Sequence, residues 1–150
     1  MNLIISHFHQ ENRGIFEVCS SFLKMARFVE NDTTLTVAPL FHIAGLAILT
    51  LPILFKGGTV IIEDEFKATE VLGYITDKKV TCLFLVPFMW LMLVQLPGFY
   101  QRDLSVLRFG ISAGSKCTSH INGKLQEKGI PFFRGIRYDR SGSGCHDGYL

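Results

Sequence analysis

The sequence has no paired cysteines. Its four cysteines stand far apart and form no C-x-x-C motif: Cys19, Cys82, Cys117 and Cys145. This spacing excludes the common zinc-finger and zinc-ribbon patterns and offers no framework of disulfides. Unpaired cysteines are typical of a reducing compartment, so we expect a cytoplasmic protein.

The sequence also lacks an excess of one charge and has no internal repeats. Its 15 Lys and Arg side chains are offset by 13 Asp and Glu, which leaves a formal net charge of +2. Acids and bases are interspersed along the chain, so no strong electrostatic field is available to attract a polyanion. We therefore predict that nucleic acid is not a partner.

No segment has the full pattern of a secretory leader or of a membrane span. Residues 1–5 are apolar but lack a basic start and a long apolar core. Residues 38–55 contain His42 and two prolines, and residues 82–96 are shorter than the roughly 20 apolar residues that a span needs. A membrane-spanning protein remains an alternative that these features disfavour.

Apolar residues are abundant instead. Hydrophobic residues make up 48% of the 150 residues, and the mean hydropathy is +0.29. This length suits a single domain with a hydrophobic core. The high apolar content indicates surface that partner segments cover or that meets lipid, so peripheral membrane association stays open. The oligomeric state is not indicated.

The segment from residue 34 to residue 63 predicts a βαβ unit. Residues 35–38 and 59–62 are short runs rich in β-branched residues, and we expect both to be buried strands. Between them, residues 43–55 are apolar almost throughout, too long for a strand and suited to a buried helix. In nearly all such units the crossover is right-handed and the two strands are parallel.

The rest of the chain continues the alternation of strands and helices. We predict helices over residues 2–29, 66–79, 88–96 and 117–128, and strands over residues 81–86, 106–111 and 130–133. Pro39 and Pro87 end the first and third strands because proline has no N–H to give to a central sheet. Pro97 and Gly98 stop the helix before them. The fold class is therefore α/β, with parallel βαβ units and helices on both faces of the sheet.

The turns that follow parallel strands are where such sheets usually place ligands. Phe41, His42 and Gly45 lie in the first of these turns. From spacing alone, a core histidine bonded to a carbonyl is the favoured interpretation of His42. The turn at residues 113–115 consists of small residues, which let the backbone approach a flat or anionic ligand closely.

Four blocks of the sequence carry a family resemblance. They are APLFHIAGL (38–46), LPILFKGGTVII (51–62), VTCLFLVPFMWLML (80–93) and DLSVLRFGISAG (103–114). In this order and spacing they resemble blocks of the acyl-adenylate-forming ligases, the AMP-binding family, and most of all its fatty acyl-CoA synthetases. The resemblance is clearest over residues 32–135. It implies that residues 1–135 form an incomplete part of the family's large domain.

The resemblance also implies roles for individual residues. His42 would be the catalytic residue that positions the carboxylate, and Phe41 and Gly45 would shape the acyl side of the site. The pocket wall would include Val86 and Pro87. The nucleotide-binding turn would be formed by Ala113, Gly114 and Ser115, although Lys116 stands where the family usually has proline.

The implied reaction is ATP-dependent acid–CoA ligation. A carboxylate attacks the α-phosphate of Mg-ATP to give acyl-AMP and pyrophosphate, and coenzyme A then displaces AMP to give a thioester. The implied cofactors are ATP, Mg²⁺ and coenzyme A, and the expected small-molecule partner is a fatty acid. No metal-ligating residues are assigned within the chain.

Two blocks of the family do not occur in the 150 residues: the phosphate loop T-S-G-T-T-G-x-P-K-G and the G-Y-G-x-T-E block. The C-terminal domain with its catalytic lysine is not represented either. We therefore expect a central fragment of a ligase that is inactive by itself. The alternatives are a non-catalytic module that binds acyl or adenine groups, and a non-functional product.

Residues 136–150 have no apolar period and much glycine and serine, which predicts a disordered end. If residues 137–141 are encoded AGG TAT GAC AGA AGC, reading one nucleotide later gives Gly-Met-Thr-Glu, close to the second missing block. We therefore expect a one-nucleotide shift near Ile136, which sequencing of the gene would test.

Overall fold

The computed structural model describes residues 13–115 and 117–134. Five strands form one parallel sheet in the order β2-β1-β3-β4-β5. This confirms the predicted fold class. The strands are β1 (Thr33–Thr36), β2 (Thr59–Ile62), β3 (Cys82–Phe84), β4 (Phe109–Ser112) and β5 (Phe132–Arg134).

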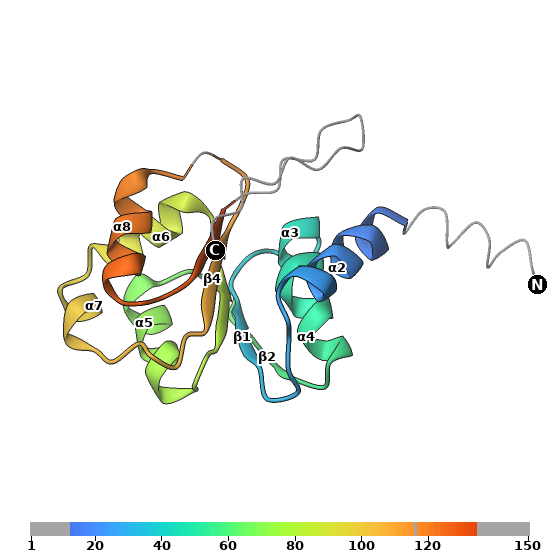
Figure 1. Ribbon diagram of the computed structural model, residues 1–150, viewed down its shortest axis with the longest axis horizontal. Coiled ribbons are helices and arrows are strands. Elements are labelled where there is room, and N and C mark those ends of the chain that lie inside the picture. Colours follow the sequence, from blue (N-terminus) through green and yellow to red (C-terminus); the bar gives the residue numbers. More distant parts are fainter. Residues whose placement is uncertain (1–12, 116, 135–150) are drawn as a thin grey trace, which may run out of the picture.

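Helices cover both faces of the sheet (Figure 1). On one face lie α5 (Ala68–Asp77), α6 (Pro87–Val94) and α8 (Ser119–Glu127), with the short α7 (Pro97–Gln101) beside them. On the other face lie α2 (Arg13–Met25) and a continuous helical segment made of α3 (Ile43–Gly45), η1 (Leu46–Thr50) and α4 (Leu51–Phe55).

Each face has its own hydrophobic cluster. Leu83 of β3 belongs to the cluster that also contains Trp90, whereas its neighbour Phe84 belongs to the cluster that contains Ile53. Successive side chains of a strand point to opposite faces, so an unbroken apolar strand supplies both clusters. This is why residues 82–85 are all buried and why their sequence shows no alternation.

The helix expected over residues 43–55 is present, but its middle turn is π-helical. Residues Leu46–Thr50 form η1, and Pro52 follows in the first turn of α4. Proline has no N–H to give to a carbonyl of the preceding turn. The irregular turn therefore lies where the regular hydrogen-bond ladder is interrupted, and π turns of this kind are frequent at functional sites.

The expectation that the second strand is buried is wrong. β2 is an edge strand whose residues are half-buried or exposed, and Ile62 is 54% exposed. β-branched composition indicates a strand but does not reveal whether a neighbour lies on each side of it.

Two helices differ from their predicted limits. Pro97 ends α6 as expected, but it also starts α7, because proline is well suited to the first position of a helix. Within the helix expected over residues 2–29, the structure describes α2 from Arg13 to Met25. The predictions for residues 2–12 and for the tail at residues 136–150 lie outside the described residues.

An ion pair between the buried Asp32 and the partly exposed Arg108 joins the starts of β1 and β4 at the amino-terminal edge of the sheet. Asp32 is 1% exposed and its Oδ2 accepts a 2.6 Å hydrogen bond from Arg108 Nη1. Val29 N–H and the Thr81 hydroxyl also donate to this carboxylate, at 2.8 and 2.7 Å. Burial acts to raise the pKa of Asp32, but these three donors outweigh it and lower that pKa below its ordinary value.

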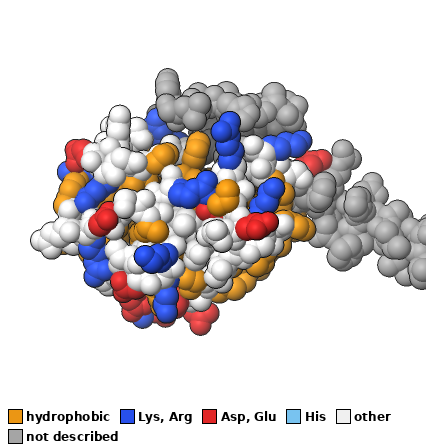
Figure 2. Space-filling view, turned by 60° about the horizontal axis from the view of Figure 1, so that its bottom comes forward, with side chains coloured by type: hydrophobic (Ala, Val, Ile, Leu, Met, Phe, Trp, Pro, Cys, Tyr) orange, Lys and Arg blue, Asp and Glu red, His pale blue; other side chains and the backbone are white. Residues whose placement is uncertain are grey.

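Charged side chains of both signs are interspersed with hydrophobic ones on the face that Figure 2 shows. Several large apolar side chains are exposed: Val29, Leu54, Phe55, Ile62 and Phe88. In the part of the chain that the structure describes, no helix has the length and apolarity to cross a bilayer.

Candidate functional site

Three turns gather at the carboxyl-terminal edge of the sheet. They follow β1, β3 and β4, which lie side by side and run parallel. The ends of β1 and β4, which lead into the turn that carries His42 and the turn at residues 113–115, are therefore two strand spacings apart, about 10 Å. Residues of all three turns, Ala44, Val86 and Ala113, pack against the same hydrophobic cluster.

Backbone hydrogen bonds hold His42 at the start of the helical segment. His42 N–H donates to Pro39 O at 3.0 Å, and the N–H groups of Gly45 and Leu46 donate to His42 O at 3.0 and 3.2 Å. The imidazole itself caps the helix, because Nδ1 accepts a 3.1 Å hydrogen bond from Ala44 N–H. Among the described residues the turn is thus a fixed structure rather than an open loop.

The interpretation of His42 as a core histidine is wrong. The residue is exposed, and its ring nitrogen accepts a backbone N–H instead of donating to a carbonyl. Since Nδ1 is the acceptor, a neutral His42 carries its proton on Nε2. Among the described residues this N–H has no hydrogen-bond partner, so it can donate to an oxygen anion.

Glycine is required at position 45. A Cβ atom there would lie 2.4 Å from Pro39 O and 2.8 Å from Ala38 O, both backbone atoms. The close approach packs the start of the helix directly onto the end of the first strand. Phe41, in contrast, is 94% exposed and contributes no packing to the turn.

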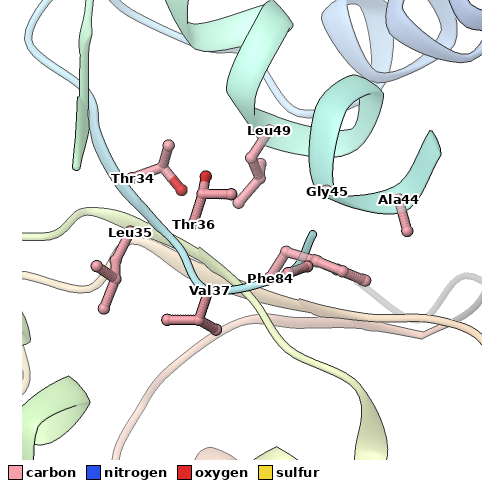
Figure 3. A pocket seen from close by; sticks show the side chains of 9 residues that line it. Thr34, Leu35, Thr36, Val37, Ala44, Gly45, Leu49 and Phe84 are labelled. Carbon is pink, nitrogen blue, oxygen red and sulfur yellow. The ribbon is translucent and has the colours of Figure 1, made fainter. Parts of the chain in front are cut away.

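A small cavity of about 10 Å³ lies beneath this turn (Figure 3). It is lined by residues of β1 and of the turn after it, by Leu49 of η1 and by Phe84 of β3. This volume is at the lower limit for one water molecule. Val86 and Pro87 lie outside its lining, the first half-buried and the second buried at the start of α6.

The turn after β4 has the open backbone that small residues permit. Gly114 has φ of +98°, a Cβ atom added to it would meet no other atom within 4 Å, and both Gly114 and Ser115 are exposed. Immediately before this turn, the Ser112 hydroxyl is buried without a hydrogen-bond partner in the described structure. Lys116 is outside the described residues.

The cysteines near these strands are not poised for nucleophilic chemistry. Burial is the main cause that raises the pKa of the Cys82 thiol to about 12. Burial also raises the pKa of Cys117. Thiols that stay protonated are weak nucleophiles. Among the described residues, no group of three or more His, Cys, Asp and Glu side chains is arranged to hold a metal ion.

Sequence reasoning missed two hydroxyl groups that support the first turn. Thr36 lies in β1 and Thr50 in η1, and both are buried. Their hydroxyl oxygens are 2.8 Å apart, and Thr50 Oγ1 donates to Gly45 O at 2.6 Å. A signal was present, because Thr50 is the one polar side chain in the apolar run over residues 43–55.

Known proteins resemble this chain in sequence and in fold. The family described as "AMP-binding enzyme" matches residues 7–135. A feruloyl-CoA synthase of Amycolatopsis sp is 31% identical over 126 residues, which are 84% of this chain and 26% of that protein. The 4-coumarate–CoA ligase CCL1 of Humulus lupulus is 33% identical over 101 residues, which are 67% of this chain and 18% of that protein.

Among solved structures, the N-terminal domain of FACL13 from Mycobacterium tuberculosis superposes with a TM-score of 0.73 at 26% identity. The match covers 80% of this chain and 30% of that one. The chain spans about a quarter of the length of the feruloyl-CoA synthases that it matches.

Proposed function

Because the chain belongs to the AMP-binding enzyme family, we propose that it supplies part of the carboxylate and adenylate site of an ATP-dependent acid–CoA ligase. The observation that supports this most is the alignment of β1, β3 and β4. Parallel pairing brings the His42 turn and the turn at residues 113–115 to the same edge of the sheet.

In this proposal His42 positions the carboxylate. In the part of the chain that the structure describes, Nε2–H is unbonded, and the other ring nitrogen is held by Ala44 N–H. A donor fixed in this way stabilises negative charge without having to reorganise. The exposed apolar side chains that flank it in the sequence, Leu40, Phe41 and Ile43, are suited to the body of an acid that is not polar.

The turn at residues 113–115 holds the adenine ring in this proposal. The positive φ of Gly114 and the open space around it allow a flat ring to lie against the backbone. ATP supplies the phosphoanhydride that activates the acid, and the thiol of coenzyme A takes the acyl group while AMP leaves. The chain's own residues bind and orient the reactants.

We further propose that residues 1–150 alone do not form acyl-CoA. The sequence contains neither the phosphate loop nor the G-Y-G-x-T-E block of the family, so the main groups that would stabilise charge on the phosphates are missing from it. ATP–pyrophosphate exchange with a fatty acid tests the first step, and formation of acyl-CoA above a protein-free blank, once coenzyme A is added, would refute the proposal. The alternative is a binding module without catalytic activity. Calorimetry with a non-hydrolysable acyl-AMP analogue would identify it, because such a module binds the analogue although it shows no turnover.

The proposal also specifies which class of carboxylic acid is the substrate. The sequence blocks resemble fatty acyl-CoA synthetases, whereas the relatives named above are a feruloyl-CoA synthase and a 4-coumarate–CoA ligase. We propose a fatty acid, and titration with palmitoyl- and feruloyl-AMP analogues decides between the two classes. Tighter binding of the feruloyl analogue would assign an aromatic acid instead.

A further inference from the structure

We infer that Thr50 is a positioning residue, whose hydroxyl holds the His42 turn in place through a buried relay from Thr36 to Gly45. The inference deepens the proposed function, on which it rests for the meaning of His42. It assigns a task to a residue that lies a full helical turn beyond the resemblance block containing the histidine.

The direction of the relay follows from the number of protons. Thr50 Oγ1 donates its single proton to Gly45 O at 2.6 Å. The 2.8 Å contact between the hydroxyls of Thr36 and Thr50 must then use the proton of Thr36. A chain of two hydrogen bonds therefore runs from β1 through the helix to the backbone of the turn.

The relay ends on Gly45, which is bonded to the His42 backbone and adjoins the residue that holds the imidazole. Gly45 N–H donates to His42 O at 3.0 Å, and the preceding Ala44 N–H donates to His42 Nδ1 at 3.1 Å. Gly45 is also packed against backbone oxygens of residues 38 and 39. A displacement of the Gly45 backbone would therefore disturb its bond to His42 O and shift the adjoining Ala44 N–H, which holds the ring.

The π-helical turn makes the relay possible. Thr50 is the last residue of η1 and its hydroxyl reaches back five residues to Gly45. Figure 3 shows Thr36 on the strand, with the helix that carries Gly45 and Leu49 packed over it. An interior hydroxyl that bonds a carbonyl of the preceding turn alters the local helix geometry. The π-helical turn and the hydrogen bond from Thr50 to Gly45 therefore occur together as one structural feature.

Thr34 provides a matched control. It lies two residues before Thr36, so both side chains point to the same face of β1. Thr34 is fully buried and also lines the cavity, but its Oγ1 has no hydrogen-bond partner in the described structure. Replacing either threonine by valine removes one hydroxyl from the same environment, but only Thr36 belongs to the relay.

The test compares the full chain with Thr50→Val, Thr50→Ser, Thr36→Val and Thr34→Val. Long-range ¹H–¹⁵N spectra at alkaline pH, where imidazoles are neutral, report which ring nitrogen of His42 carries the proton. We expect the Nε2–H form in the wild type, Thr50→Ser and Thr34→Val. Thr50→Val should give a mixture of the two forms, and Thr36→Val a smaller change in the same direction.

Affinity for the palmitoyl-AMP analogue provides the second measurement. We expect Thr50→Val to weaken binding about tenfold, the factor that corresponds to one lost hydrogen bond. Thr50→Ser should restore it. If the wild type binds no analogue, the proposed function fails, while the spectra still decide whether Thr50 positions the ring.

A wild-type His42 spectrum in Thr50→Val would overturn the inference. If that variant does not fold, Thr36→Val decides, because it removes only the first donor of the relay. In that case, two results would show that the hydroxyls contribute to packing alone. One is an unchanged distribution of the proton between the His42 ring nitrogens in Thr36→Val, and the other is an equal change of that distribution in Thr34→Val.

Discussion

At the scale of single residues, the site depends on one histidine with one nitrogen engaged and one nitrogen free. The sequence alone favoured a buried role for His42, because a lone histidine in an apolar stretch is usually structural. The structure places it outside the core as a helix cap. The sequence block that contains His42 indicated a turn after the first strand. Only the fold reveals that the His42 side chain is exposed.

Replacing His42 by alanine should therefore separate binding from stability. The side chain is exposed and makes one cap hydrogen bond, so we expect its loss to cost no more than about 1 kcal/mol of unfolding free energy. Affinity for an acyl-AMP analogue should fall about tenfold. His120→Ala is the control, since His120 is an exposed histidine on α8. Equal affinities of the two variants would remove His42 from the site.

Gly45 should tolerate no side chain. In Gly45→Ala the new methyl group would meet the backbone oxygen of Pro39 at 2.4 Å, and we expect a loss of at least about 2 kcal/mol in chemical denaturation. Gly123→Ala is the matched control, because nothing lies within 4 Å of that position in α8. It should raise stability by roughly 0.5–1 kcal/mol. A stable Gly45→Ala variant would show that the turn is looser than described.

At the scale of helices and strands, the alternation of apolar segments was sufficient to predict each of the five strands in the described sheet and one helix in each connection between them. It did not predict that β2 lies at an edge or that Pro97 begins a helix. It also gave no sign of the ion pair between Asp32 and Arg108, which are 76 residues apart. Pairing over such distances depends on sheet order, which local periodicity does not contain.

The ion pair predicts a pH dependence. The pKa of Asp32 is lowered in the folded state. A carboxyl group of this kind adds stability above its unfolded pKa of about 3.9, and this stability is lost as the pH falls through the folded pKa. We expect unfolding free energy, measured by urea denaturation at successive pH values, to fall on acidification below that range.

Removing the arginine should alter that profile. Arg108→Met leaves the Asp32 carboxylate buried with two donors, and because the guanidinium is 38% exposed we expect a cost of about 2 kcal/mol at neutral pH. The part of the acid-induced loss that comes from Asp32 should then be smaller, because without Arg108 the folded-state pKa of Asp32 moves back up toward its unfolded value. The control is Arg102→Met, which removes an exposed arginine bonded to the Thr76 hydroxyl. Identical profiles for both variants would contradict the structural role of the pair.

At the scale of the whole molecule, parallel pairing makes a shared site out of turns that are some 70 residues apart in the sequence. This could be predicted, because parallel strands place their carboxyl ends together. The hydroxyl relay beneath the first turn could not, since it needs a π-helical turn and a strand in one particular register.

The central claim is that the His42 turn and the turn at residues 113–115 form one binding surface, and NMR titration of the chain with a non-hydrolysable acyl-AMP analogue tests it most directly. We predict that the amide resonances of Gly45 and Gly114 shift together with a single Kd. The amide resonance of Gly57 should not shift, because Gly57 precedes β2 and so lies at the amino-terminal ends of the strands, opposite the proposed site. A response at one turn alone, or at Gly57 instead, would contradict a shared site.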